Sequence, residues 1–320
     1  MERKVLGIDI GGTKIAVIYA RENGGIELVD KMVFPTTGVD DTIHNIFLHL
    51  ERMMEKHGLN TENVHAAGIS CGGPLSSERG VVMSPPNLQG WDNIPIVDMV
   101  KERFHIRCAI QNDANACALA EWKFGAGKGT KNMVFLTFGT GLGAGLIING
   151  QLYSGTNDNA GEVGHIRLAP FGPVGYGKAG SFEGFASGGG IAQLARTRLT
   201  EKYQMGETVG WCARADVDAV TAQQVALQAQ QGDAMALEII GQSGRFLGQG
   251  LAVLIDILNP ECIVIGSIYA RNESLFAPVV QEVLRREALG LSHQVCKIKP
   301  AELGEQIGDY AAVSIAANLS

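Results

Sequence analysis

Two glycine-rich segments of similar design recur in this chain, and each joins two apolar runs through a tight turn. The first covers residues 5–17 and turns at Gly11-Gly12-Thr13; the second covers residues 133–148 and turns at Gly139-Thr140-Gly141. Apolar runs joined in this way predict a β-hairpin. Glycine permits positive φ and leaves backbone N–H groups open to a ligand, so such a turn can bind an anion. The duplication therefore indicates a nucleotide-using phosphotransferase built from two related halves.

The composition suits a globular α/β enzyme of two domains. The chain has 320 residues, of which 46% are hydrophobic, 18% are charged and 42 are glycine. A formal net charge of −7 argues against a general surface for nucleic acid or anionic membrane. No apolar run reaches about 18 residues, so no membrane span is predicted. A strand is expected almost from the first residue, so no signal peptide is predicted. The six cysteines are scattered without a C-x-x-C pair, which is typical of free thiols in a cytoplasmic protein.

Strands and helices are expected to alternate along the rest of the chain. Residues 66–70 and 107–110 have the pattern of buried strands, and the second leads through Asn112 and Asp113 into a helix. A helix capped by Asp40-Asp41-Thr42 is expected to end at Gly58. Further helices are expected at about 95–104, 183–204, 221–231, 233–257, 273–288 and 308–319, and further strands at 262–266 and 295–299. This alternation implies a largely parallel or mixed sheet with ligands at the strand ends.

Several polar residues beside the two turns could contact phosphate. Asp9 ends the first strand immediately before the turn, where a carboxylate could hold Mg²⁺ or only cap the turn. Thr13 and Thr140 could donate hydroxyl hydrogen bonds, although threonine is also a common turn residue. Lys14 could equally be a solvated strand residue.

Two other groups could contact a second substrate. Asp113 lies where a strand gives way to a helix, so it could cap the helix or take a proton from a hydroxyl acceptor. Glu162, His165 and Glu183 lie in a glycine-rich stretch, where polar residues could bind a ligand or only face solvent.

Seven short motifs follow one another in a fixed order. They are Asp9–Lys14; Gly68–Ser70 with Gly73-Pro74; Pro86–Leu88 with Gly90-Trp91; Asn112–Ala116 with Ala120-Glu121; Gly139–Gly143; Gly161–His165; and Glu183–Gly188. In this order the chain resembles the ROK family of bacterial sugar kinases and repressors, within the actin/hexokinase/Hsp70 superfamily. The resemblance implies an α/β fold of two ribonuclease H-like (actin/hexokinase-type) domains with an interdomain cleft. The expected domains are 1–118, completed by a C-terminal helix over about 303–320, and 119–302.

The resemblance also implies an activity and a set of site residues. The expected protein is a glucokinase- or fructokinase-like homodimer that uses ATP and Mg²⁺ to phosphorylate glucose or a related hexose or N-acetylhexosamine. Asp113 matches the position of the general base. The positions that match sugar-binding residues are Gly73, Asn87, Asn112, Glu162, His165 and Glu183. The positions that match nucleotide-binding residues are Asp9, Gly11, Gly12, Thr13, Lys14, Thr140, Gly141 and Gly266.

The chain departs from the family pattern in two places. Residues 175–181 contain no cysteine where the family usually has a cysteine-rich zinc motif, so we expect no structural zinc and leave open what orients His165. Gly72 stands where the family often has proline.

Two other functions are possible for a protein with these motifs. The first is a catalytically inactive sugar-binding or regulatory protein of this family. A DNA-binding repressor is disfavoured because only four residues precede Val5, where repressors carry a helix-turn-helix. The choice of sugar and of the hydroxyl phosphorylated stays open.

Overall fold

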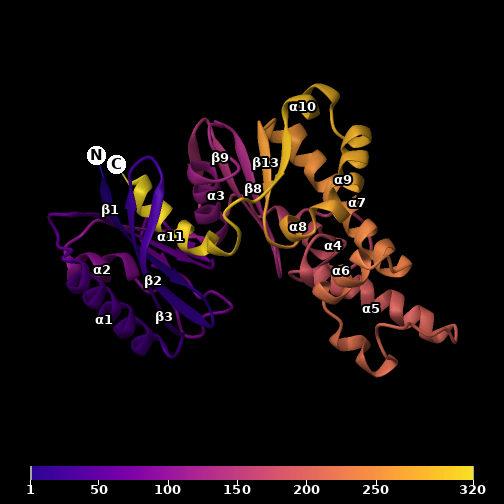
Figure 1. Ribbon diagram of the computed structural model, residues 1–320, viewed down its shortest axis with the longest axis horizontal. Helices are drawn as coiled ribbons and strands as arrows, with labels where there is room; N and C mark the ends of the chain where they lie inside the picture. The colour runs from indigo at the N-terminus through magenta and orange to yellow at the C-terminus, as the bar shows by residue number, and fades with distance from the viewer. Residues whose placement is uncertain (1, 320) are drawn as a thin grey trace. The chain divides into compact units, whose positions relative to one another are not determined.

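The computed structural model describes residues 2–319 and divides into two compact α/β units (Figure 1). The first unit comprises Met1–Lys131, Gly145–Ala160 and Glu302–Ser320, and the second comprises Asn132–Ala144 and Gly161–Ala301. The α/β class expected from the sequence is confirmed. The expected domain limits at 118/119 and 302/303 stay a prediction.

The first unit is organised around a five-stranded sheet with the order β3-β2-β1-β4-β7. Its strands are β1 (Arg3–Ile10), β2 (Lys14–Glu22), β3 (Ile26–Pro35), β4 (Val64–Cys71) and β7 (Cys108–Asn112). β2 is antiparallel to both β1 and β3, whereas β4 pairs in parallel with both β1 and β7. The parallel strands therefore bring their C-terminal ends, and with them Asp9 and Asn112, to one edge of the sheet.

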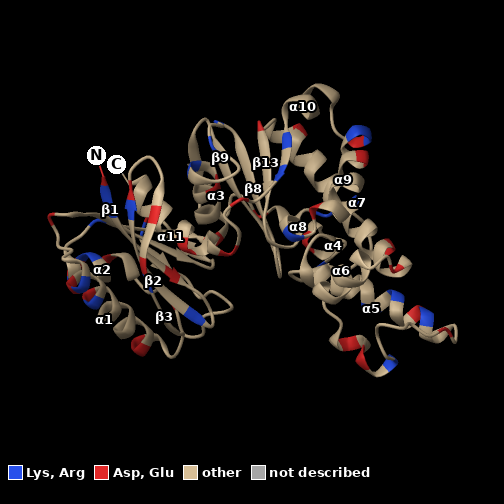
Figure 2. Cartoon of the chain, in the orientation of Figure 1, with Lys and Arg blue, Asp and Glu red and all other residues tan. Residues whose placement is uncertain are grey.

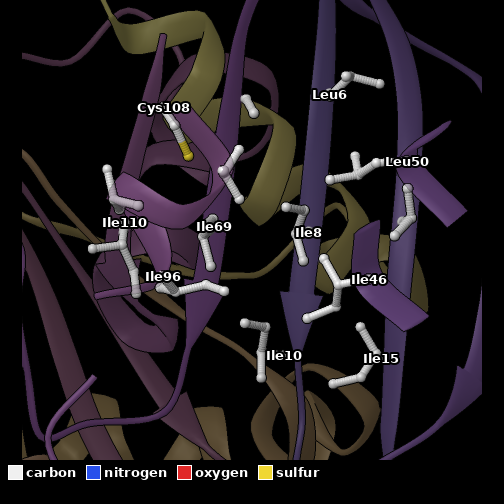
Figure 3. Close-up of a cluster of buried hydrophobic side chains, with 14 of the residues drawn as sticks. Leu6, Ile8, Ile10, Ile15, Ile46, Leu50, Ile69, Ile96, Cys108 and Ile110 are labelled. Carbon is white, nitrogen blue, oxygen red and sulfur yellow. The ribbon is translucent and has the colours of Figure 1, made fainter. Parts of the chain in front are cut away.

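One face of this sheet packs against α1 (Val39–His57) and α2 (Ile96–Phe104). Figure 3 shows Ile46 and Leu50 of α1 pointing toward Leu6, Ile8 and Ile15 of the strands. The buried positions on α1 recur at the helical spacing that the sequence predicts. The expected cap is wrong, since Gly38 is the N-cap and Asp40 and Asp41 lie in the first turn, where they face the positive end of the helix dipole.

The other face of the sheet packs against α11 (Ile307–Asn318), which also contacts α3 (Asp113–Phe124). The contact is close because glycine stands at its centre. A Cβ built on Gly68 would lie 2.6 Å from the Ala316 nitrogen, and one built on Gly7 would lie 2.9 Å from Val313 Cγ1. The backbone of α11 therefore lies almost directly on β1 and β4.

A second five-stranded sheet has the order β10-β9-β8-β13-β14. Its strands are β8 (Met133–Phe138), β9 (Leu142–Ile148), β10 (Gln151–Tyr153), β13 (Cys262–Ile265) and β14 (Lys297–Pro300). β13 is parallel to β8 and β14, and β10 is antiparallel to β9. Two short hairpins complete the strands, formed by β5 (Leu75–Ser76) with β6 (Val81–Val82) and by β11 (Val174–Gly175) with β12 (Lys178–Ala179).

The second unit contains helices of very different length. They are α4 (Phe182–Phe185), α5 (Gly188–Gln204), α6 (Ala222–Gln230), α7 (Ala234–Leu258), α8 (Ser267–Arg271), α9 (Glu273–Glu287) and α10 (Gly290–Val295). The single helix expected over 183–204 is wrong, because the Ser187 side chain caps a new helix by accepting a hydrogen bond from the Gly190 nitrogen.

The charged residues are mixed in sign along the helices. Figure 2 shows acidic and basic residues interspersed on α1 and α5. Within residues 2–319, no helix combines the length and the apolar character needed to cross a membrane.

Candidate active site

The turn between β1 and β2 presents open backbone groups. Gly11 closes the turn by donating its N–H to the Lys14 oxygen at 3.1 Å, and Thr36 Oγ1 donates to the Gly11 oxygen at 2.6 Å. Gly12, Thr13 and Lys14 are exposed. The turn is thus held from behind, and the residues that carry its N–H groups, hydroxyl and ammonium are exposed to solvent, as an anion-binding turn requires.

Asn87 lies against the same turn. A Cβ built on Gly12 would lie 2.7 Å from the Asn87 oxygen, and one built on Gly72 would lie 3.4 Å from Asn87 Oδ1. The exposed Gly73 follows directly. The structure therefore brings the Gly12 turn, Asn87 and the Gly72-Gly73 loop together within the first unit.

Asp9 is partly buried and carries an unfavourable charge. Burial raises its pKa to about 6, and the negative charges of Asp309 and Asp113 raise it further than Lys31 and Lys14 lower it. Over residues 2–319, the Asp9 carboxylate accepts no hydrogen bond. A carboxylate without a protein donor, in a net negative field, is a suitable ligand for a hard divalent cation. Asp9 therefore fits the Mg²⁺ of a nucleotide.

At the start of α3, Asn112 caps the helix and the adjacent Asp113 does not. Asn112 is the N-cap, and its Oδ1 accepts a hydrogen bond from the Asn115 nitrogen at 2.7 Å. Asp113 is the first helical residue, and its Oδ1 accepts from the Ala114 nitrogen at 2.8 Å. The Asp113 residue is exposed at the surface. The surrounding protein nevertheless shields its carboxyl from water, which raises the pKa above the ordinary value, and the backbone hydrogen bonds that lower this pKa have a smaller effect. Asp113 is thus relieved of the capping role and keeps an exposed carboxylate.

In the second unit, the turn between β8 and β9 is fixed by two helix starts. Gly188 of α5 donates its N–H to the Gly139 oxygen at 2.7 Å, and Gly189 donates to the Thr140 oxygen at 3.3 Å. The carboxylate of Glu183, in the first turn of α4, accepts from the Leu142 nitrogen at 2.9 Å. Glu183 Oε2 would lie 2.7 Å from a Cβ built on Gly141. Glu183 therefore supports the turn directly.

Gly266 lies beside this second turn. It ends β13, donates its N–H to the Leu136 oxygen at 2.9 Å and begins α8. The next residue, Ser267, has its Oγ 3.6 Å from a Cβ built on Gly139. Gly266 and the Thr140-Gly141 turn are thus neighbours at one edge of the second sheet.

Glu162 and His165 lie on a short helical turn of the second unit, Val163–His165 preceded by Glu162. The His165 ring is exposed and approaches the Tyr176 ring edge-on, with centroids 6.3 Å apart. Lys178 Nζ donates to the His165 oxygen at 2.7 Å. Both partners belong to the β11–β12 hairpin, whose turn residues Tyr176 and Gly177 have φ of 42° and 74°. This hairpin includes most of residues 175–181, the stretch in which the resemblance would place a zinc motif and which contains no cysteine.

A protein-only metal centre does not occur within residues 2–319, where no group of three or more His, Cys, Asp or Glu could hold an ion. A nucleotide-bound Mg²⁺ needs fewer protein ligands, because phosphate oxygens and water complete its coordination. The arrangement around Asp9 is compatible with that mode of binding.

Each unit brings together part of the residues that the sequence singled out. The first unit holds Asp9, Gly11, Gly12, Thr13, Lys14, Gly73, Asn87, Asn112 and Asp113, and the second holds Thr140, Gly141, Glu162, His165, Glu183 and Gly266. Sequence reasoning missed the ion pair between Lys31 and Asp309, which acts on Asp9. No local pattern in the sequence indicates this pairing, because the two residues are 278 positions apart.

Comparisons with known proteins agree with this fold. The model of the ROK family matches residues 5–318. The glucokinase of Halalkalibacterium halodurans is 34% identical over 286 residues, which cover 88% of this chain and 85% of that protein. The crystal structure of a ROK family glucokinase from Streptomyces griseus, in complex with glucose and AMPPNP, has a TM-score of 0.77 and 29% identity, covering 99% of this chain and 100% of that one. A ROK family transcriptional regulator, a homologue of the E. coli MLC protein, has a TM-score of 0.83 and 27% identity, covering 98% and 78%.

The fold and these similarities define a sugar kinase of the actin/hexokinase type. The chain belongs to the ROK family.

Proposed function

We propose that the protein is an ATP-dependent hexokinase that phosphorylates a hydroxyl of glucose or of a related hexose or N-acetylhexosamine. The observation that carries the proposal is the start of α3, where Asn112 caps the helix and Asp113 keeps an exposed carboxylate of raised pKa. The similarity to glucokinases, one of them with bound glucose and AMPPNP, supports the choice of substrates.

Asp113 is the general base of the proposed reaction. It accepts the proton of the sugar hydroxyl as that oxygen attacks the γ-phosphorus, and the bond from the γ-phosphorus to the bridging oxygen breaks to release ADP. The proton then passes from Asp113 to solvent, so sugar and ATP give sugar phosphate, ADP and H⁺. A raised pKa suits this role because it strengthens the carboxylate as a proton acceptor.

The two glycine turns bind the phosphates of the nucleotide. Gly11, Gly12, Thr13 and Lys14 offer N–H groups, a hydroxyl and a positive charge, and Thr140 and Gly141 offer a second set. Mg²⁺ held through Asp9 would neutralise the charge on the transferred phosphoryl group. Gly266, beside the second turn, faces the adenosine.

The sugar hydroxyls are held by amide, carboxylate and imidazole groups. Asn87, Asn112, Glu162, His165 and Glu183 provide these groups, with the Gly73 backbone nearby. A substrate that lacks one of the matching hydroxyls would leave a polar group unpaired, which gives such a site its selectivity. Lys178 and Tyr176 orient the His165 segment without zinc.

The proposal extends to the organisation of the protein. The domain limits follow the family pattern, with 1–118 and about 303–320 in one domain and 119–302 in the other. The active protein is a homodimer and has no nucleic acid partner.

The test is an ADP-release assay over a panel of hexoses and amino sugars, followed by Asp113→Asn. The variant should lower kcat on the best sugar by about 10²–10⁴-fold, while sugar binding measured by calorimetry stays within about threefold. Asp218→Asn, which changes an exposed aspartate of the second unit, is the control and should keep full activity. An Asp113→Asn enzyme that retains half its turnover would exclude Asp113 as the base. A wild-type protein that binds sugar without releasing ADP would favour an inactive regulatory member of the family.

A further inference from the structure

An ion pair lies beside Asp9 on the α11 face of the first sheet. Lys31 Nζ of β3 contacts both carboxylate oxygens of Asp309, at 2.6 and 2.8 Å. Asp309 is in the first turn of α11 and is only 8% exposed. A carboxylate this deeply buried requires a partner, and Lys31 is that partner.

The strand register places Asp9 on the same face as this pair. Lys31 pairs with Ile18 of β2, and Ile18 pairs with Gly7 of β1. Side chains two residues apart on a strand share a face, so Asp9 lies on the face of Gly7. Ile18 packs against α11, which identifies this face as the one that α11 covers.

The first turn of α11 approaches Asp9 closely. A Cβ built on Gly308 would lie 3.1 Å from Asp9 Oδ2, so only a residue without a side chain gives the carboxylate this much room. Asp309 follows immediately, and its charge raises the pKa of Asp9 whereas the charge of Lys31 lowers it. Asp113 and Lys14 are the other charged groups that act on Asp9. Asp9 and Asp309 are therefore two carboxylates within the field of one ammonium.

We infer that Asp309 is a positioning residue that holds the Lys31 ammonium away from Asp9 and so keeps Asp9 free for nucleotide-bound Mg²⁺. The observation behind this is an asymmetry: Asp309 takes both contacts from Lys31, whereas Asp9 accepts no hydrogen bond within residues 2–319. Without the Asp309 charge, the half-exposed Lys31 ammonium would no longer be held on α11 and could turn toward Asp9, on which its charge already acts. An ammonium paired with Asp9 would then compete with Mg²⁺ for the same oxygens.

The inference rests on the proposed function, because it assumes that Mg²⁺-nucleotide binds at Asp9. A purely structural ion pair between β3 and α11 would give a different result. It would change stability when either partner is replaced, but it would not change the dependence of nucleotide binding on Mg²⁺.

The test compares Asp309→Asn, Lys31→Met and the double variant by calorimetry with AMPPNP, titrated with and without Mg²⁺. Asp309→Asn should weaken Mg²⁺-dependent AMPPNP binding about tenfold, because an ammonium close to Asp9 typically changes the affinity of that carboxylate for a cation by about this factor. Metal-free AMPPNP binding should stay unchanged or tighten. Lys31→Met/Asp309→Asn should restore Mg²⁺-dependent binding to within about threefold of wild type, because no competing ammonium remains.

Two controls separate positioning from folding. Lys56→Met removes the surface ion pair with Asp30 in the same unit and should leave Mg²⁺-dependent binding unchanged. Asp309→Glu keeps a partner for Lys31 and should bind Mg²⁺-AMPPNP as wild type does. Should Asp309→Asn fail to fold, Asp309→Ser removes the same charge with a smaller side chain and takes its place. Asp309→Ser should show the same loss of Mg²⁺-dependent binding, and an unchanged Mg²⁺ dependence would overturn the inference.

The outcomes that overturn the inference are distinct from failure of the proposed function. A double variant as impaired as Asp309→Asn would overturn it, as would Asp309→Asn with unchanged Mg²⁺ dependence. Wild-type protein that does not bind Mg²⁺-AMPPNP would overturn the proposed function and this inference together.

Discussion

The Asp9 carboxylate is ionised at neutral pH in surroundings that favour its protonated form. Burial raises its folded-state pKa to about 6 from an ordinary value of 3.8. Between these values the native state binds more protons than the unfolded state, so this group lowers stability as the pH rises through that window. The ionised form of Asp9 therefore lowers the stability of the folded protein, as expected of a functional carboxylate.

Asp9→Asn should consequently stabilise the ligand-free protein at pH 7.5 by about 1–3 kcal/mol, since one pKa unit corresponds to about 1.4 kcal/mol. The gain should shrink toward zero at about pH 4, where the native carboxyl is already protonated. Urea unfolding of both proteins in metal-free buffer at the two pH values measures this difference. An Asp9→Asn protein equally stable or less stable than wild type at pH 7.5 would contradict it.

The sequence does not determine which of two adjacent polar residues caps a helix, or which distant charged residues pair. Whether Asn112 or Asp113 caps α3 depends on which residue takes the extended backbone before the first turn, and Asn112 does so with φ −66° and ψ 159°. The pairing of Lys31 with Asp309 joins residues 278 positions apart, and no local pattern reports it. Candidate residues at strand ends were predictable because glycine turns and helix starts have local signatures. Their electrostatic partners were not.

Glu121 links two elements that are distant in sequence. It is fully buried in α3, and its carboxylate accepts hydrogen bonds from the nitrogens of Ala126 at 2.8 Å, Leu303 at 2.9 Å and Glu302 at 3.3 Å. Glu121 thus satisfies backbone donors both at the end of its own helix and in the segment that leads into α11.

Glu121→Ala should lower the free energy of unfolding by about 3 kcal/mol or more, because several buried N–H groups lose an acceptor at once. Glu121→Gln keeps one acceptor oxygen and should lose less. Glu62→Ala, at an exposed loop position, serves as control and should stay within about 0.5 kcal/mol of wild type. Chemical denaturation followed by circular dichroism gives the three values. A Glu121→Ala protein as stable as the Glu62→Ala control would show that these hydrogen bonds contribute little.

Elements with strong periodicity were predicted closely, and those governed by tertiary packing were not. The helix expected at 233–257 is observed at Ala234–Leu258, since its apolar face recurs over many turns. β3 was not predicted, because all but one of its residues are partly buried or exposed and give no clear alternation. The continuous helix expected over 183–204 is two helices because Ser181 and Ser187 each cap a start, and the three glycines 188–190 bring α5 against the second turn.

For the molecule as a whole, we expect stability and activity without zinc. The β11–β12 hairpin is closed by local contacts: Arg167 Nη1 donates to the Ala179 oxygen at 2.6 Å, and the Ser181 side chain caps α4. A structural zinc would contribute folding free energy that chelation removes. Treatment with a strong zinc chelator followed by restored Mg²⁺ should therefore leave the melting temperature and the kinase rate unchanged. Elemental analysis that finds one zinc per chain, lost together with activity, would contradict this expectation.

The position of α11 has a consequence for how the chain is made. The chain passes between the two units at four points, and α11 (Ile307–Asn318) covers strands as early in the chain as β1 (Arg3–Ile10) and β4 (Val64–Cys71). On a nascent chain the apolar row of Val5, Ile18 and Ala66 has no cover until residues 307–318 have left the ribosome. The N-terminal sheet, although synthesised early, can therefore complete its packing only late, and until then the apolar face that α11 covers stays open to solvent.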